Sequence, residues 1–524
     1  MADFTREEVE SILTDIAAAL EAEEAEEEFE EEIEVIEEVV DETDESAEDK
    51  AEENELSSEE SDTTEESDTT EEEDAEEDQE DQDEEEAEQD NFPLKACDLS
   101  GLDLSGLNFY RTNMEETNLT GTNLSGTDLT GVTLDNAVLK GANLTDANLT
   151  DATLIQADLA KAQLEDANLQ GTTLSGANLS HANLDRANLR KSKFVGSNLT
   201  ACQLNKVTFE YAEFSRAKLT GAKIVESDLS RSKFNGADLS DVDFTDSRLS
   251  MGIFFEAKLV RANLNRAKIK GAKLVGVDFT DAILTRADLT NADLTEAKIL
   301  QADLTRANLN GSILRRAHLE NSNLMEANLN IANLTEANLV NVILNGADLG
   351  RIKLQGARLN GAKLAKANLK KAKMRDAELL GADLSGANLT GADLTGAKLA
   401  KADLSRADLT EAILEGTDLK KAFLAGANIQ EANLSGANLE GTDMAGAKLL
   451  KSNLSRANLT GANLRRADLE HADFSDADAS QVNFAGAKLA DAKFIGTNLT
   501  DADFADTDVT DTDFTGAKGY RPPA

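Results

Sequence analysis

The chain contains few residues of the types that carry out catalysis, and their spacing keeps them apart. It has three histidines, His181, His318 and His471, and two cysteines, Cys97 and Cys202, among 524 residues. A histidine beside a carboxylate could act as a general base, and a histidine–cysteine cluster could hold a metal ion. The histidines lie more than a hundred residues apart, each on a position that we assign to solvent. We therefore expect no catalytic, cofactor-binding or metal site, and no enzyme.

Carboxylates are abundant, but they recur at a fixed interval and form no distinct pair. Asp or Asn often comes directly before a large apolar residue, and this order repeats every five residues. General acid–base catalysis needs two groups with different surroundings, which a regular ladder does not supply. The glycines follow the same spacing, which is typical of turns and not of a phosphate-binding loop. We interpret both sets as the solvated surface of a repetitive structure.

The repeat behind this spacing runs from Leu99 to Phe514 without a change of register. It comprises 84 consecutive five-residue units, and 82 of their centres are Leu, Phe, Ile or Met; the exceptions are Ala479 and Val509. Two residues before each centre stands a small residue, mostly Ala, with Ser, Thr and some Val. A period of five fits neither an α-helix nor a strand alone. It indicates a chain that turns a corner every five residues and stacks each turn on the one before.

One unit shows how the repeat builds a column. In Ala382-Asp383-Leu384-Ser385-Gly386, Ala382 and Leu384 point inward, because residues two apart on an extended segment share a face. Asp383 and Ser385 then point to water, and Gly386 lies outside at the corner. Four such sides close a coil of about twenty residues. A bulky residue at the small position would overpack the interior.

This pattern resembles the pentapeptide-repeat family, whose repeat reads small-Asp/Asn-Leu/Phe-polar-Gly. Residues 392–396 (ADLTG) and 457–461 (ANLTG) match it at every position. The resemblance covers roughly residues 94–518 and implies an all-β solenoid, a right-handed quadrilateral β-helix. About 21 coils at ~4.8 Å each make a rod on the order of 100 Å long. Local departures are large residues at small positions and one unusually apolar unit: Leu102, Leu107, Ile352 and Met251–Phe255.

The residues before the repeat lack the five-residue period and are predicted to form a helical segment and a disordered acidic linker. Residues 1–40 are predicted to be an amphipathic helical segment that begins with a Thr5–Glu8 capping box. Helical spacing predicts a docking helix with the apolar stripe Val9, Ile12, Leu13, Ile16 and Leu20, followed by a second stripe at Phe29, Ile33, Ile36 and Val40. The alternative is that the helix caps the first coil near Leu94. Residues 41–92 are predicted to be a disordered acidic linker, 93–518 the β-helix and 519–524 a short tail.

Charge is distributed unevenly along the chain. The formal net charge is −51, of which −45 belongs to residues 1–90 and −6 to the rest. Residues 181–380 carry 31 basic and 22 acidic side chains, a net of +9, whereas the column is acidic on either side of them. We expect the acidic tail to fold loosely over this basic belt and to gate access of polyanions to it. Screening over ~8 Å at physiological salt makes such an association dynamic.

Two further surface features are not explained by the repeat alone. Arg266, Arg286 and Arg306 are spaced by twenty and should stack on one corner as a polyanion stripe, or else compensate repeat charges such as Asp246 and Glu326. The last coils carry phenylalanines on two opposite faces, and no helix follows to cover the final coil. An uncovered coil presents unpaired backbone, which predicts end-to-end pairing of two rods. The coils that would pair contain Phe474, Phe484, Phe494, Phe504 and Phe514.

These features favour a non-catalytic interaction or scaffold protein with protein partners and without cofactors. Two alternatives remain: the family resemblance implies a DNA mimic that protects a type II topoisomerase through acidic C-terminal coils, and the belt implies a nucleic-acid or other polyanion binder. Residues 468–514 hold 12 acidic side chains against Lys488 and Lys493. No run of eighteen apolar residues and no secretory signal is present, and both cysteines fall on inward positions. We therefore expect a cytoplasmic protein without a membrane span.

Overall fold

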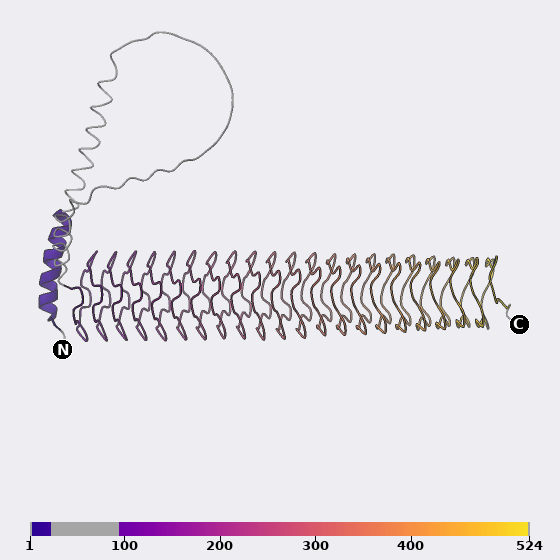
Figure 1. Cartoon of the computed structure of the whole chain (residues 1–524), viewed down its shortest axis with the longest axis horizontal. Helices are drawn as coiled ribbons and strands as arrows, with labels where there is room; N and C mark the ends of the chain where they lie inside the picture. The colour runs from indigo at the N-terminus through magenta and orange to yellow at the C-terminus, as the bar shows by residue number, and fades with distance from the viewer. Residues whose placement is uncertain (1–2, 23–93, 522–524) are drawn as a thin grey trace, which may run out of the picture.

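The structure, a computed structural model, describes residues 3–22 and 94–521. From residue 98 to residue 518 the chain forms one long column of stacked coils (Figure 1). One residue in every five forms a bridge, and each bridge pairs in parallel with the residue twenty positions later, from Asp98–Asn118 to Asn498–Lys518. A coil therefore contains twenty residues and four bridges, and the predicted coil length is confirmed. Each side of the coil contributes a single bridging residue, and no side contains a strand longer than this one residue.

The backbone hydrogen bonds explain why this sequence repeats as it does. In the unit 382–386, the N–H of Asp383 donates to the coil before it, and those of Leu384 and Gly386 donate to the coil after it. The N–H of Ala382 closes a turn on Leu379, and the remaining one, from Ser385, donates to the Asp383 carboxylate at 3.0 Å. All five donors are thus satisfied. The recurrent Asp or Asn completes the turn by accepting this last N–H.

The interior of the column is filled by the two inward positions of each unit. Ala382 is 1% exposed and Leu384 is fully buried, and nearly every equivalent pair between residues 132 and 499 is buried in the same way. Phe194, Phe214, Phe234 and Phe254 stack within one inward column at 4.8–5.0 Å between ring centroids. One continuous apolar core therefore runs through the rod, as expected for a solenoid.

The corner residues take a backbone conformation that only turns require. The last residue of each unit has a positive φ, for example 64° at Gly386, 60° at Arg406 and 57° at Glu431. All three are exposed, so the corners lie outside the coil, as the sequence predicts for Gly386.

A helix over residues 6–22 lies across the N-terminal end of the column (indigo in Figure 1). Its predicted capping box is confirmed, because the Thr5 N–H donates to the Glu8 carboxylate at 2.7 Å and the Glu8 N–H donates to Thr5 Oγ1 at 3.3 Å. The Thr5 N–H and the Thr5 hydroxyl, which donates to the same carboxylate at 2.9 Å, hold the pKa of Glu8 below its usual value. The second helical stripe at 29–40, the acidic linker and the expected gating of the belt fall outside the described residues.

Most departures from the repeat are accommodated locally. Ile352 is fully buried despite its size, whereas Leu102 and Leu107 are half-buried and pack against the end of the core. Met251 and Phe255 are exposed, so the unusually apolar unit places apolar surface in water. The prediction that both cysteines are buried is wrong for Cys97, because it lies in the first coil, where no earlier coil covers its side chain.

Candidate functional site

The N-terminal helix is attached to the first coils by its first turn and by Asp3, which lies just before it. The backbone of Asp3 donates to the Asp98 carbonyl at 2.6 Å, and the Asp3 carboxylate accepts the Asp98 N–H at 2.7 Å. Arg6 then donates to the carbonyls of Asp103 and Ser105 at 3.0 and 3.1 Å. The helix therefore satisfies backbone groups at an end where no further coil does so.

The apolar stripe of the helix divides into a covered and an uncovered half. Val9 and Leu13 are buried in the core of the column, and Ile12 packs against it. These contacts are the ones expected of the capping alternative. Ile16 and Leu20 are half-buried, and they line a cavity instead. All five residues of the predicted docking helix thus face the column.

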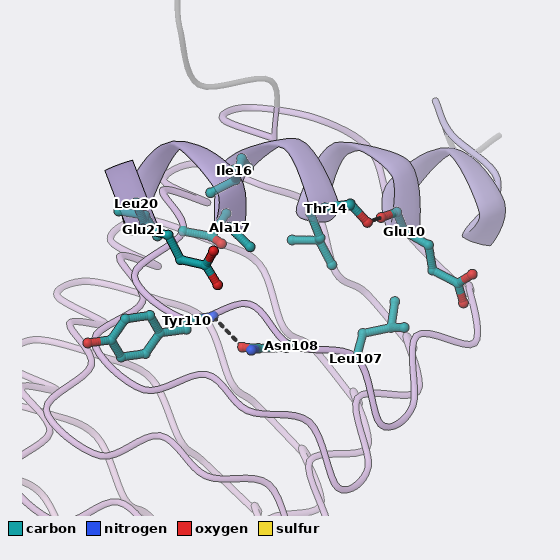
Figure 2. Close-up of a pocket in the computed structure, with 11 residues that line it drawn as sticks. Glu10, Thr14, Ile16, Ala17, Leu20, Glu21, Leu107, Asn108 and Tyr110 are labelled. Carbon is teal, nitrogen blue, oxygen red and sulfur yellow. Dashed lines mark hydrogen bonds between the residues drawn. The ribbon is translucent and has the colours of Figure 1, made fainter. Parts of the chain in front are cut away.

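The cavity lies between the second half of the helix and the coil below it (Figure 2). It has a volume of about 570 Å³, and Leu107, Asn108 and Tyr110 form its opposite wall. Glu10 and Glu21 lie at its edge, and Thr112 lines it with a buried hydroxyl that has no hydrogen-bond partner in the described structure. An apolar side chain with one polar group would fit this site.

The arginine column is largely neutralised by its neighbours. Arg266 forms a two-pronged ion pair with Asp246, with 2.6 Å between Nε and Oδ1, and this bond holds the pKa of Asp246 below its usual value. Arg306 pairs with Glu326 at 2.7 Å. Arg286, between them, has no ion pair within the described part of the chain. Arg266 and Arg306 therefore compensate the charges of neighbouring carboxylates, which is the alternative to a polyanion-binding stripe.

The last coils contain the aromatic cluster that the sequence indicates. Phe474, Phe494 and Phe514 stack in one column at 4.6 and 5.3 Å, and Phe484 and Phe504 stack in a second at 5.0 Å. Sequence reasoning missed Tyr520, whose ring stacks on Phe514 at 3.7 Å. Since it lies outside the five-residue register, the repeat gives no signal for it.

The final coil leaves part of its backbone without a partner coil. The N–H of Leu499 is the last inward donor that reaches a later coil, at the Lys518 carbonyl. Within the described residues, no coil follows to accept the N–H groups of Phe504, Val509 and Phe514. Tyr520 therefore covers the side chain of Phe514 but leaves the backbone N–H groups of the final coil without acceptors.

The two cysteines differ in their surroundings. Burial raises the pKa of Cys202 to about 12, and its Sγ donates to the Leu179 carbonyl at 2.9 Å. Partial burial, and then the nearby Asp3 carboxylate, raise the pKa of Cys97. Both shifts favour the neutral thiol, whereas a reactive cysteine has a lowered pKa.

The shifted pKa of Cys202 predicts a pH-dependent stability. The folded state favours the neutral thiol of Cys202. The stability that this thiol contributes is therefore complete below pH 9, the ordinary pKa of a cysteine, and is lost as the pH rises toward about 12. We expect the free energy of unfolding of the parent to fall over this window relative to Cys202→Ala, by up to about 1.4 kcal/mol per pH unit. Urea unfolding of both proteins between pH 8 and 11 measures this difference. Parallel curves would show that the thiol ionises equally in both states.

No catalytic arrangement appears in the part of the chain that the structure describes. His181, His318 and His471 are exposed, each on an outward position. Among residues 3–22 and 94–521 there is no cluster of three potential metal ligands, and no helix has the length and apolar character to cross a membrane.

Comparison with known proteins agrees with this architecture. The family model described as pentapeptide repeats matches the chain in successive segments, most of them overlapping, from residues 97–136 to residues 483–518. No curated protein matches the chain.

Several solved structures are similar over part of the chain. HetL, a pentapeptide repeat protein from the cyanobacterium Nostoc that is involved in heterocyst differentiation regulation, is 34% identical; the alignment covers 43% of this chain and 89% of HetL, with a TM-score of 0.17. QnrB1, a plasmid-mediated fluoroquinolone resistance protein, is 21% identical over 40% of this chain and 88% of its own, with a TM-score of 0.19. Because these TM-scores are low, the assignment rests on the family model.

Proposed function

Because this chain belongs to the pentapeptide-repeat family, we propose that it is a non-catalytic, rod-like interaction protein that holds partners along a right-handed, four-sided β-helix. The four bridges per coil and the positive φ at each corner support the four-sided cross-section. The observation that carries the proposal is the unbroken column from residue 98 to residue 518, whose outward positions are mostly polar and whose described part contains no catalytic cluster. Such a rod can fix the distance between partners bound at different coils.

The domain boundaries follow from the same reading. We propose a helical segment at 1–40, an acidic linker at 41–92, the β-helix at 93–518 and a tail at 519–524. Helix 6–22 acts as a cap through Val9 and Leu13, and its uncovered half, at Ile16 and Leu20, contributes to docking.

Affinity capture from the native cell tests the interaction proposal. We expect the full chain to retain at least one protein in stoichiometric amount, and a chain without residues 1–90 to lose those partners that need the tail. A rod that retains no protein under either condition would contradict the proposal.

The open edge of the last coil supports pairing of two rods through their C-terminal coils. The N–H groups of Phe504, Val509 and Phe514 provide an edge to which a second copy can add. We expect sedimentation equilibrium to give twice the mass of the chain, 2 × 56.1 kDa. Val509→Lys should reduce this mass to that of one chain, because it places charges at the pairing edge. A single-chain mass for the parent at tens of micromolar would exclude the pairing.

A second candidate function rests on the acidity of the same coils. Asp501, Asp503, Asp506, Asp508 and Asp511 all lie on the exposed surface of the last coil. This density suits mimicry of duplex DNA toward a type II topoisomerase, because duplex DNA carries one charge per ~1.7 Å. Inhibition of gyrase supercoiling by the full chain, with loss in a variant that has Asn at these positions, would support it. An unaffected enzyme would exclude it.

A further inference from the structure

The positive charge of the belt lies on one side of the column. We define the basic face as the outward residues of ten stacked five-residue runs, 191–195, 211–215 and so on every twenty residues to 371–375. In each run the second and fourth residues are buried and the other three face outward. This face carries eleven Lys and Arg against two carboxylates, Glu213 and Asp293. The other three sides of residues 181–380 carry twenty cations and twenty carboxylates, so the whole excess of +9 lies here.

Most cations of the basic face have no ion-pair partner. Three lie within 4 Å of a carboxylate: Arg231 of Glu210 at 3.8 Å, Lys273 of Asp293 at 3.9 Å, and Arg375 of Asp393 at 3.7 Å. In the part of the chain that the structure describes, the other eight form no ion pair, among them Lys191, Lys193, Arg351, Lys353, Lys371 and Lys373. The arginine column, by contrast, is paired with carboxylates at two of its three positions. The basic face therefore has charge available for a partner.

An apolar cluster interrupts the cations near the middle of the face. Met251 is 61% exposed, Phe255 is 43% exposed, and Ile253 and Val275 are half-exposed beside them. Gly271 makes room for Met251, because a Cβ at Gly271 would lie 2.6 Å from the Met251 sulfur. Met251 therefore packs over Gly271 of the next coil, while the outer surface of the cluster remains exposed to water.

Lysines lie directly above and below this cluster. Parallel bridges join Lys233 to Ile253 and Ile253 to Lys273, so the three residues occupy successive coils of one column. Adjacent coils lie about 4.8 Å apart. An apolar centre with a charged rim is the arrangement found at protein interfaces.

We propose that the basic face is the docking surface for an acidic protein segment that carries large apolar side chains at its middle. This inference rests on the proposed function and assigns the face and the chemistry of the partner. The apolar side chains of the segment pack on Met251, Ile253 and Phe255, and its carboxylates pair with the lysines on either side. Ten coils span about 43 Å, the length of about 13 extended residues.

The composition of the face favours a protein segment over other anions. Single-stranded nucleic acid binds on aromatic stacking platforms, and the face has two aromatic residues, Tyr211 and Phe255. Tyr211 already lies under the guanidinium of Arg231, 5.4 Å from the ring centroid. Binding to a lipid surface needs a continuous apolar stripe. Met251, Ile253 and Phe255 lie together, whereas the other large exposed aliphatic residues of the face, Ile313 and Ile331, lie three and four coils later, with Lys273 and Asp293 in between.

Binding of a designed probe to the full chain tests the proposal. The probe is a labelled 14-residue peptide with five Glu, a central Phe-Leu-Ile-Phe and five more Glu; its partner probe has Ser-Gly-Ser-Gly at the centre. We expect fluorescence anisotropy to show binding of the first that weakens with salt, and at least tenfold weaker binding of the second. Met251→Thr/Phe255→Thr and Lys233→Glu/Lys273→Glu should each weaken binding of the first probe at least tenfold.

Matched variants on another side of the column provide the control. Met325 and Phe423 are exposed to a similar degree, 37% and 52%, but lie outside the basic face. Met325→Thr/Phe423→Thr and Lys223→Glu/Lys363→Glu should change probe affinity less than twofold. Circular dichroism should show the same spectrum for all four variants, since every substituted side chain faces outward.

The possible results separate the two proposals. Equal binding to all variants, or no binding of the probe, would overturn the assignment of the face. Binding of phosphatidylserine vesicles or of a DNA oligonucleotide that depends on the same residues, without binding of the peptide, would also overturn it and would identify the other occupant. The interaction function itself fails only if the native cell yields no stoichiometric protein partner, whichever face is altered.

Discussion

Replacing Leu384 by Asp should open the column around this residue. Leu384 is fully buried, and Leu364 and Leu404, which occupy the same position in the coils before and after it, are buried too. A carboxylate there would have no cation or hydrogen-bond donor in the apolar core. Removal of a buried leucine side chain alone costs about 2–5 kcal/mol, and the charge adds to this cost. We expect a loss of at least about 4 kcal/mol in the coils around the substitution.

The repeat architecture makes this loss measurable as a local event. In a solenoid each coil contacts only its neighbours, so distant coils keep their structure. Amide exchange should become fast from about residue 364 to about residue 404 and stay slow near both ends of the rod. Ser385→Asp is the control, because Ser385 faces outward and only its backbone N–H bonds to Asp383. If Leu384→Asp keeps the melting temperature and exchange rates of the parent, the inward assignment of the five-residue centres is wrong.

The five-residue period predicts almost the whole core because each inward position obeys one local rule. The centre and the small residue two positions before it are buried from unit to unit, and Ala479, an exception in sequence, is fully buried as well. The rule holds where a coil has neighbours on both sides. It fails at Cys97 and Leu102, which are half-exposed because the first coil has a neighbour on one side only.

The attachment of the ends could not be predicted in the same way. Asp3 and Arg6 bond to carbonyl groups nearly a hundred residues away, and no periodicity links them to Asp98 or Asp103. The position of Tyr520 on Phe514 likewise depends on a chain segment beyond the repeat. Such contacts are set by the three-dimensional ends of the rod.

The charge of the belt illustrates an intermediate case. Composition predicts a net charge of +9 for residues 181–380. It does not show which side of the column carries the excess. Only the twenty-residue register, fixed by bridges such as Lys233–Ile253–Lys273, places the excess on one side. The Arg266 column, which the sequence singles out, proves to be mostly paired, whereas the unpaired cations lie on a neighbouring side.

Replacing Val9 by Asp should release the N-terminal helix from the column. Val9 is fully buried against the first coils, and Arg6 one turn before it holds the carbonyls of Asp103 and Ser105. A carboxylate beside Leu13 would lose its hydration, and Arg6 already donates to Glu10 and to the two carbonyls, so docking should weaken by about 2–4 kcal/mol. Residues 9–22 should then exchange amide protons rapidly. Their exchange in the parent should be slow, because the helix is docked.

Release of the helix should also change the behaviour of the rod itself. The first coil would expose Leu94 and Leu99 together with backbone groups that Asp3 now satisfies. An uncovered edge of this kind promotes association, so light scattering should detect larger species in Val9→Asp than in the parent. Ser11→Asp, on the exposed side of the helix, should leave both measurements unchanged. Fast exchange of residues 9–22 in the parent itself would instead mean that the helix is free, and its apolar stripe would then be a motif that becomes ordered when a partner binds.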